Sequence, residues 1–374
     1  MRKRSWVICF MLITLLVPLF ANGNDEKQSV VDPVTLNTPV AVPTAKPKAE
    51  YLLRFSWSDP ADPLRQSTSA YANVFKNDLE RLSAGRIKVE LYPAAQLGDQ
   101  NSSTEQVAKG TIEACNISSG VLASLYFPKL GILDAPYIFK TREEGRRFLD
   151  VKNSPFMIKL AEECRKATGI RLLDVTPFGF RNMTNNKRPI HSPADMKGMK
   201  IRTMQIVPHM KMIEAFGASA TPIPFAELYT SLQTNVIDGE ENTIQNIVAQ
   251  KFYEVQKYVT VTQHVLGIGA TLINDAWYQA LPDDLKIAVY EADRNAVLAY
   301  NGVGQILDVV GMQTLKTKNV NIYVPNEQER EAFVQASVPA VRAWMEQKYG
   351  KDFVSNFYNA VDKTDRQLQA EALM

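Results

Sequence analysis

Patterns typical of strands and helices alternate along residues 51–117, and this order constrains the fold more than any other feature of the sequence. Residues 51–57 alternate apolar and polar side chains, as a half-buried strand does. Residues 64–84 then repeat apolar side chains at helical spacing. Such alternation predicts a parallel sheet with helices on its faces, the α/β class of fold. The further strand patterns are 87–91 and 111–117, with a short helical pattern at 101–109 between them.

A second series of strand and helix patterns begins near residue 170 and predicts a second unit of the same kind. The chain has 374 residues, more than one hydrophobic core usually serves, so two lobes are expected. Strand patterns near 175–181 and 260–266 exceed the usual strand length and predict strands that cross between the lobes. The remaining strand patterns are 170–176, 180–186, 199–203 and 256–262, and the helical ones are 208–216, 225–234, 282–318, 326–347 and 350–361.

These patterns predict how the chain divides into lobes. The N-terminal lobe comprises residues 50–175 together with part of the chain after about residue 263. The C-terminal lobe comprises residues 176–262, and residues 263–374 supply a hinge strand, a long helix and the closing helices. The expected architecture is therefore a two-lobed α/β fold. Each lobe is a sheet flanked by helices, and crossing strands and a long helix join the two. The cleft between the lobes is where a ligand is expected.

The N-terminus predicts export from the cytoplasm. Residues 2–4 are basic, residues 6–21 are apolar, and small residues stand at 21 and 23, which is the order of a cleavable signal peptide over residues 1–23. A retained membrane anchor is the alternative. However, spanning a bilayer takes about 20 apolar residues, and this stretch is shorter. Cleavage would place the mature protein in the periplasm.

Residues 24–49 are predicted to form a disordered linker. They contain four prolines among Val, Thr, Ala and Lys, a composition that cannot bury a core. If the signal peptide is not removed, this segment would act as a tether. The folded part of the chain is therefore expected to begin near residue 50.

Composition and motifs argue against several classes of function. Basic and acidic residues number 42 and 40 with no basic run, so nucleic acid is not an expected partner. Metal-ligand spacing, a nucleophile elbow and a phosphate loop are all missing from the sequence. Gly267-Ile268-Gly269 lacks the third glycine of a dinucleotide-binding motif. We therefore expect no catalytic residue, no metal and no cofactor.

Cysteine usage agrees with export but leaves the state of the thiols open. Cys115 and Cys164 are the only cysteines that follow the predicted signal peptide. An oxidising compartment would let them form a disulfide. Two free, buried thiols are the alternative.

Several short motifs occur in a specific order between about residues 51 and 345. The most specific stretch runs from Arg181 to Asn185 and continues through Pro193–Arg202. The other motifs are Gly85–Gly98, Lys109–Glu113, Asp134–Phe139, Gly217–Pro222, Phe225–Tyr229, Leu232–Asn235 and Asp238–Asn242. Each motif alone is weak, but their order and spacing resemble the substrate-binding proteins of tripartite ATP-independent periplasmic (TRAP) transporters, the DctP-like family.

The resemblance implies a two-lobed periplasmic binding protein fold that closes over an organic acid. In that family the arginine that ends the Lys-Gly-x-Lys-x-Arg motif forms a bidentate salt bridge with the ligand carboxylate. Arg202 holds this position here, and its planar guanidinium matches a carboxylate fork. Three further positions match a second arginine, an asparagine that binds the carboxylate and an aromatic residue that packs on the ligand: Arg181, Asn242 and Phe225. The alternative roles are structural: a surface ion pair for Arg202, a strand-edge charge for Arg181, a turn-stabilising Asn242 and a core aromatic at Phe225.

The N-terminal lobe departs from the pattern of family members that bind sugar acids. By motif register, its cleft positions are Trp57, Ser58, Gln100 and Ser118. No carboxylate that could bind sugar hydroxyls stands at 100 or 118, and the Phe178-Gly179-Phe180 stretch adds aromatic bulk before Arg181. Aromatic faces favour a flat ring, whereas hydroxyl groups buried without partners are costly. Trp57, Phe180 and Phe225 therefore predict an aromatic or otherwise apolar monocarboxylate as the ligand.

The resemblance implies capture of the acid in the periplasm and delivery to the small and large membrane subunits of a TRAP transporter. A monomer is expected. A protein that presents its ligand to a membrane sensor is an alternative, and a periplasmic lyase or isomerase acting on a carboxylate is another. The enzyme would need a His, Glu or Asp of perturbed pKa beside Arg202 and Asn242, and none is evident in the motifs. We therefore expect a binding protein and not an enzyme.

Overall fold

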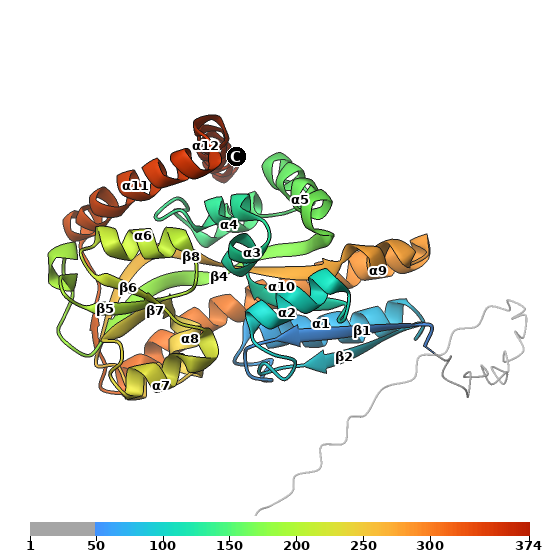
Figure 1. Ribbon diagram of the computed structural model, residues 1–374, viewed down its shortest axis with the longest axis horizontal. Coiled ribbons are helices and arrows are strands. Elements are labelled where there is room, and N and C mark those ends of the chain that lie inside the picture. Colours follow the sequence, from blue (N-terminus) through green and yellow to red (C-terminus); the bar gives the residue numbers. More distant parts are fainter. Residues whose placement is uncertain (1–48) are drawn as a thin grey trace, which may run out of the picture. The chain divides into compact units, whose positions relative to one another are not determined.

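The computed structural model describes residues 49–374, whose nine strands form one hydrogen-bonded sheet (Figure 1). The strand order is β2-β1-β3-β8-β4-β7-β5-β6, and β9 pairs with β8. The predicted signal peptide (1–23) and linker (24–49) lie outside the described residues, apart from residue 49. Within the described part, no helix is both long enough and apolar enough to cross a membrane.

One end of the sheet is built from residues 51–118, whose elements lie close to the predicted ranges. β1 pairs in parallel with both β2 and β3, as predicted. Gly110 ends α2 because it adopts the left-handed conformation, with φ at 72°. The elements are β1 (Tyr51–Trp57), α1 (Ser67–Leu82), β2 (Ile87–Tyr92), α2 (Gln100–Lys109) and β3 (Ala114–Ser118).

The other end of the sheet contains short strands, of which β5 pairs in parallel with both β6 and β7. β6 has only four residues, too few for an alternating pattern to stand out, and the sequence did not predict it. Gly239 begins β7, where a Cβ atom would lie 2.1 Å from the Thr184 carbonyl oxygen, so glycine lets β7 pair closely with β4. The elements are β5 (Lys200–Thr203), α6 (Val207–Ala215), β6 (Ser219–Pro222), η3 (Phe225–Glu227), α7 (Leu228–Gln233), β7 (Gly239–Thr243) and α8 (Ile244–Ala249).

Two long strands, β4 (Ile170–Asn185) and β8 (Tyr258–Asn274), run through the middle of the sheet. They pair antiparallel with each other, and β3 and β7 pair antiparallel with them. The predicted parallel pairing is therefore correct for the two ends and for β9 with β8, but not for the other pairs of β4 and β8, and the sheet as a whole is mixed. The reason is that β4 carries the chain from one end of the sheet to the other, and β8 carries it back.

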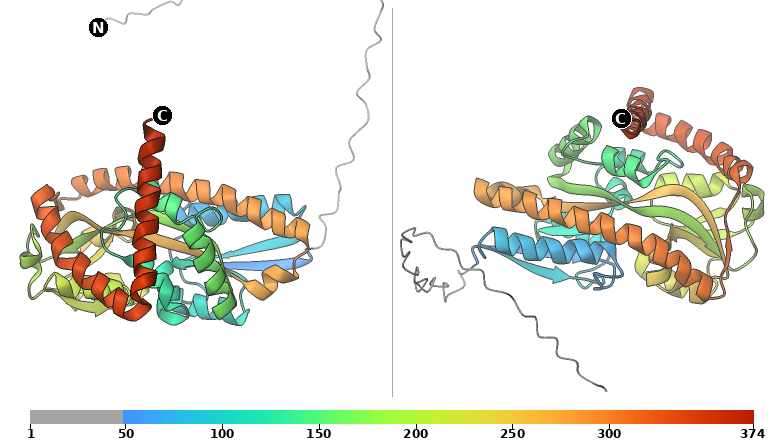
Figure 2. Two further views of the ribbon diagram at one scale, coloured as in Figure 1. Left: turned by 90° about the horizontal axis from the view of Figure 1, so that it is seen from above. Right: turned by 180° about the vertical axis from the view of Figure 1, so that it is seen from behind.

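The long predicted helix forms as α10 (Asp283–Thr317) and packs against α1, β4 and α8. It therefore contacts both ends of the sheet, as the views in Figure 2 show. The elements next to α10 are α9 (Asp275–Ala280), β9 (Asn321–Tyr323), α11 (Glu327–Tyr349) and α12 (Lys351–Ala372). Helices also form where none was predicted, α8 and α9 among them. The others are α3 (Ser119–Leu125), η1 (Pro128–Asp134), α4 (Arg142–Phe148), α5 (Pro155–Thr168), η2 (Pro193–Met196) and η4 (Phe252–Glu254).

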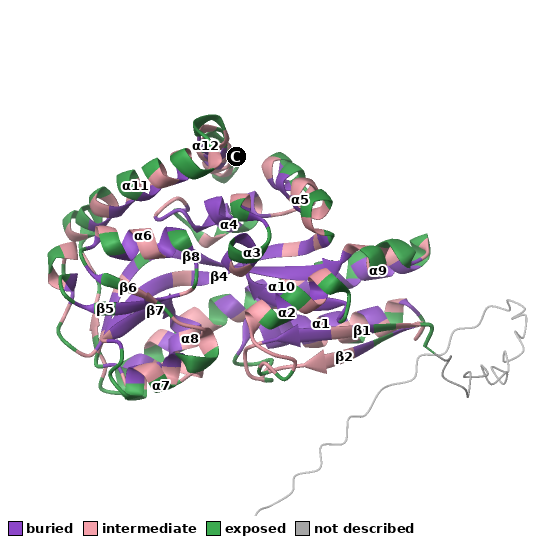
Figure 3. Ribbon diagram, in the orientation of Figure 1, coloured by how far each residue is buried: buried purple, intermediate pink, exposed green. Residues whose placement is uncertain are grey.

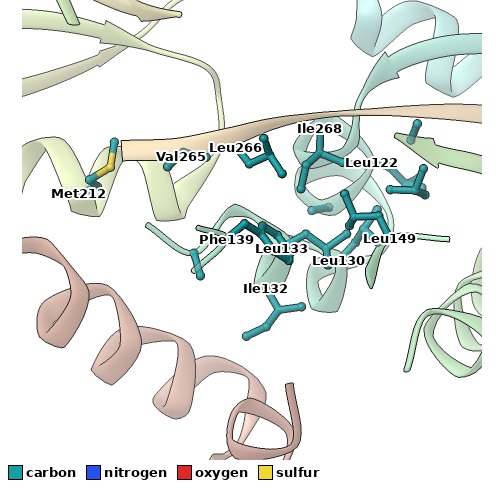
Figure 4. Close-up of a cluster of buried hydrophobic side chains, with 14 of the residues drawn as sticks. Leu122, Leu130, Ile132, Leu133, Phe139, Leu149, Met212, Val265, Leu266 and Ile268 are labelled. Atoms are coloured by element: carbon teal, nitrogen blue, oxygen red, sulfur yellow. The ribbon is translucent and has the colours of Figure 1, made fainter. Parts of the chain in front are cut away.

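Apolar side chains form three buried clusters against the sheet, whose central strands are largely buried (Figure 3). The largest cluster includes side chains of β8, such as Leu266 and Ile268, which lie against η1 residues such as Leu130 and Leu133 (Figure 4). The largest cluster therefore joins the two ends of the sheet, whereas each of the two smaller clusters belongs to one end.

Both cysteines belong to the largest cluster and are free and buried. The disulfide alternative is therefore wrong, because each thiol packs among apolar side chains. Burial raises the pKa of the Cys164 thiol to about 11 and that of Cys115 further. Both thiols are expected to stay protonated and unreactive in the folded protein.

Candidate functional site

A cavity of about 80 Å³, partly open to solvent, lies where the two ends of the sheet face each other. The loop after β1, the end of β3 and the start of α2 form one wall, and β5, β7 and α8 contribute to the other. Most of the predicted site residues line it together: Arg181, Arg202, Asn242, Phe225, Gln100, Ser118 and also Ser58.

Arg202 stands on β5 with 1% of its surface exposed. Its Nε donates to the carbonyl oxygen of Ile223 (2.9 Å), but its buried Nη1 has no hydrogen-bond partner within residues 49–374. Burial and the neighbouring Arg181 lower the pKa of Arg202 to about 10. Buried guanidinium N–H groups without acceptors are unfavourable, so this side chain is ready to bind an anion.

Arg181 stands on β4 and is also 1% exposed, but its charge is already balanced. Its Nε donates to Oε2 of Glu241 (2.5 Å) and its Nη2 to Oε1 of the same carboxylate (3.0 Å). Its Nη1 donates to Oδ1 of Asn242 (3.3 Å). Arg202 therefore differs from Arg181 in having no carboxylate of its own among the described residues.

Asn242 stands on β7 with its side-chain oxygen fully used. Oδ1 accepts hydrogen bonds from the Thr243 amide (3.0 Å) and from Asn246 Nδ2 (3.1 Å), besides the one from Arg181. No hydrogen bond within the described part of the chain uses the Nδ2 group of Asn242. These contacts fix the orientation of the amide and leave its donor for a ligand.

A cluster of charged groups lies buried behind the two arginines. Glu241 is 0% exposed and accepts from Arg181, from His209 Nδ1 (3.3 Å) and from His264 Nε2 (3.1 Å). His209 Nε2 contacts Oδ1 of Asp134 (3.1 Å). Although burial opposes each charge, Arg181 and His209 hold the pKa of Glu241 well below its usual value, and Glu241 and Asp134 raise the pKa of His209 to about 9.

The protonation of this cluster follows from its contacts. Both ring nitrogens of His209 face carboxylate oxygens, so both donate and the ring is charged. His264 Nε2 donates to Glu241, while its Nδ1 accepts from the Thr262 hydroxyl (2.7 Å), so this ring is neutral, and burial lowers its pKa. Burial and Glu241 raise the pKa of Glu240 to about 7. The sequence motifs did not reveal these perturbed groups, yet none of them lines the cavity.

Two predicted aromatic residues do not line the cavity. Trp57 is 2% exposed and packs against Phe55 (ring centroids 6.0 Å apart) in the cluster under α1 and α10, so its place as a cleft residue is corrected. Phe180 packs into the largest core cluster, whereas Phe178 lines the cavity. A β-bulge causes this exchange: the register shifts at Gly179, whose φ is 132°, and side chains two residues apart then lie on opposite faces.

The remaining predicted residues form parts of the wall. Gln100 Oε1 accepts a hydrogen bond from the Ser118 amide (2.8 Å), which joins the start of α2 to the end of β3. Phe225 lines the cavity at the start of η3 and meets Phe252 edge to face at 6.3 Å.

Several polar residues of the wall were not predicted from the sequence. They include Asp59, Gln66, Thr68, Gln245 and Asn246. Asp59 was not predicted because it has the character of an ordinary turn residue. The motif register did place the preceding residue, Ser58, in the cleft. No group of three or more His, Cys, Asp or Glu side chains within residues 49–374 is arranged to hold a metal ion.

Comparison with known proteins gives the family. Residues 61–348 match DctP, the bacterial extracellular solute-binding protein family 7. The sialic acid-binding periplasmic protein SiaP of Vibrio cholerae is 30% identical over 284 residues, 76% of this chain and 86% of that protein. The 2,3-diketo-L-gulonate-binding periplasmic protein YiaO of Escherichia coli is 30% identical over 72% of this chain and 80% of its own length.

A solved structure agrees with this match. The sugar acid binding protein DctPAm of Advenella mimigardefordensis, in complex with galactonate, is 28% identical, with a TM-score of 0.78 over 84% of this chain and 99% of that one. Both the sequence match and the fold cover most of the chain. This protein therefore belongs to the DctP family of bacterial extracellular solute-binding proteins.

Proposed function

We propose that this protein captures a small organic acid in the periplasm and delivers it to the membrane subunits of a TRAP transporter, with Arg202 as the anchor of the carboxylate. The observation that carries the proposal is the buried Arg202 guanidinium, whose Nη1 has no partner among the described residues and which lines the cavity. A ligand carboxylate would supply both the missing acceptor and the missing countercharge.

Arg181 and Asn242 support the anchor in different ways. The charge of Arg181 is balanced by Glu241, so its main contribution is to hold Asn242 Oδ1 and thereby direct the Asn242 amide donor. Arg202 and Asn242 would then share one carboxylate. The matches to the family's second arginine and asparagine support the same roles.

We further propose that the ligand carries one carboxylate. Arg181 and Arg202 are the only Lys, Arg or His side chains among the described residues that line the cavity, whereas Asp59 and Asp99 line it as well. A second ligand carboxylate would therefore meet acidic groups and no further cation. An aromatic ligand was expected because Trp57, Phe180 and Phe225 were predicted to line the cleft. Of these three residues only Phe225 lines the cavity, together with Phe178. The proposal therefore does not require an aromatic ring in the ligand.

Lobe closure completes the proposed mechanism. The predicted lobes, residues 50–175 and 176–262, contribute opposite walls of the cavity, and β4 and β8 are the strands that join them. Closure over the ligand would exclude water and strengthen the salt bridge to Arg202. The signal-like N-terminus and the periplasmic relatives support export. The likeness to a solved TRAP periplasmic solute binding protein of Polaromonas, 29% identical, supports the membrane subunits as partners.

Calorimetric titration of an organic-acid library against the wild-type protein and Arg202→Lys tests this function. One ammonium cannot reproduce the bidentate contact, so we expect a loss of about 2–4 kcal/mol of binding free energy. Arg188→Lys, at an exposed arginine outside the cavity wall, is the matched control and should bind as the wild type does. A loss below about 1 kcal/mol, the range of exposed pairs, would refute the anchor.

Recovery of the bound acid distinguishes binding from catalysis. Mass spectrometry after prolonged incubation should return the acid unchanged. Conversion of the acid into a product would favour the lyase or isomerase alternative and contradict a pure binding role.

A further inference from the structure

The cavity wall formed by the loop after β1, the start of α1 and α10 carries polar groups that the proposed carboxylate anchor does not use. They are Asp59, Gln66, Thr68 and Tyr300. The first three lie between β1 and the first turn of α1, and Tyr300 stands on α10, edge-on to Tyr71 at 6.4 Å. All belong to the half of the molecule opposite β5, which carries Arg202.

Asp59 is a partly buried carboxylate with no cationic partner among the described residues. Its backbone oxygen accepts from the Ala94 amide (2.9 Å), which fixes the loop, and its carboxylate is hydrogen-bonded by Thr68. Burial raises the pKa of this carboxyl, in contrast to the arginine-paired Glu241. One hydroxyl is a modest partner for a carboxylate, which has about four acceptor positions. Asp59 therefore has acceptor capacity left in the cavity.

Gln66 contributes the complementary donor. Its side chain lines the cavity and the residue is 2% exposed, yet its Nε2 has no hydrogen-bond partner within residues 49–374. It stands at the N-cap of α1 without capping the helix through its side chain. A buried amide donor without an acceptor is unusual, and ligands or water commonly satisfy such groups.

Four kinds of ligand group can be compared against this wall. A methyl group would leave both Asp59 and Gln66 without a partner. A carboxylate could accept from Gln66, but the negative charge of Asp59 would repel it. An ammonium could donate to Asp59 but has no lone pair for Gln66. A hydroxyl donates its proton to Asp59 and accepts from Gln66 Nε2, so it alone satisfies both residues.

We infer that Asp59 and Gln66 select a ligand bearing hydroxyl groups away from its carboxylate, and that Asp59 excludes dicarboxylates. The inference rests on the proposed function, because it presumes that the carboxylate is held at Arg202. It replaces the expectation that this wall lacks a carboxylate for hydroxyl groups: positions 100 and 118 carry none, but position 59 does.

The test compares three six-carbon acids that differ in their far end and hydroxyl content. Galactonate carries hydroxyl groups and one carboxylate, galactarate replaces its terminal CH₂OH with a second carboxylate, and hexanoate has no hydroxyl group. Titration calorimetry should give wild-type affinity for galactonate at least tenfold above that for either other acid. Asp59→Asn, which removes the charge but keeps the size, should reduce the preference for galactonate over galactarate at least tenfold.

Two further variants separate local contact from general charge and folding effects. Asp62→Asn removes an equal charge from the same loop outside the cavity wall and should leave the preference unchanged. Gln66→Met keeps the side-chain length and should weaken galactonate binding at least fivefold while changing hexanoate binding less than twofold. Melting temperatures show whether each variant is folded.

The outcomes distinguish the two proposals. Equal preferences in the wild type and Asp59→Asn, or wild-type binding of hexanoate or galactarate as tight as that of galactonate, would overturn the inference. If only apolar or aromatic acids bind and Arg202→Lys abolishes that binding, the inference fails and the proposed function stands. If no carboxylate of any class binds, the proposed function fails and the inference with it.

Discussion

Replacing His209 by glutamine should remove a pH-dependent part of the protein's stability. His209 on α6 joins η1 to β7, because its two ring nitrogens contact Asp134 and Glu241. The ring is 0% exposed and charged, and the groups that face its partners are Arg181 and His264, both bonded to Glu241. Glutamine has nearly the same reach but cannot carry the positive charge that these two carboxylates require.

The magnitude follows from the shifted pKa. An ordinary histidine has a pKa of 6.5 and His209 one of about 9, a difference that corresponds to about 3 kcal/mol of stability. Because the folded-state pKa is raised, this stabilisation is complete below about pH 6.5 and is lost as the pH rises through 9. Glu240 has a raised pKa of about 7, so its ionisation also lowers stability as the pH rises. Most of this loss has occurred by about pH 7.5, below the pH range in which His209 loses its proton.

Urea unfolding at a series of pH values, followed by tryptophan fluorescence, measures the effect. The stability difference between wild type and His209→Gln should be about 3 kcal/mol larger at pH 6.5 than at pH 10. His191→Gln, at a half-exposed histidine whose Nδ1 lies 3.8 Å from Glu329, is the control and should follow the wild-type curve. A difference between wild type and His209→Gln that stays constant across this pH range would refute the charged state derived from the contacts.

Three further predictions concern the backbone, the thiols and the N-terminus. Gly179→Ala should lower stability by about 1–3 kcal/mol, since only glycine readily adopts the bulge conformation, and a melting temperature equal to that of the wild type would contradict the strain. Cys115 and Cys164 should resist Ellman's reagent in the native protein and both react in urea; rapid native labelling would contradict their burial. N-terminal sequencing of periplasmic protein should begin near residues 22–24, whereas intact Met1 in a membrane fraction would favour the tether.

Much of the fold could be predicted because its largest elements carry long, regular patterns. β1 alternates over seven residues, and α10 repeats its apolar residues over 35. Patterns of this length identify a strand and a helix from the sequence alone. Short elements gave no such signal. β6, α3, η1 and α4 are too short for a period to emerge. α5 has 14 residues and buries Met157, Leu160 and Cys164 on one face, so its pattern was present in the sequence and was missed.

The candidate site divides in the same way between local and non-local information. Arg181, Arg202 and Asn242 could be assigned because each stands within a motif of fixed spacing. Phe180 was misplaced because the bulge at Gly179 breaks the alternation by which a strand residue is assigned to a face. Trp57 lies in the same buried cluster as Leu53 and Phe55, so the alternation of β1 itself places it in the core, and the motif register that put it in the cleft was wrong.

The groups that determine the charge of the cavity were the least visible in the sequence. Asp134, His209, Glu241 and His264 come from η1, α6, β7 and β8, and no spacing joins them. Yet they decide how many negative charges a ligand needs, because Glu241 balances Arg181 and leaves Arg202 as the cation without a carboxylate partner among the described residues. The motifs show two arginines but leave their charge balance open. The carboxylate buried behind Arg181 leaves one cation for a ligand, so these buried groups support the proposed single carboxylate although a ligand would not touch them.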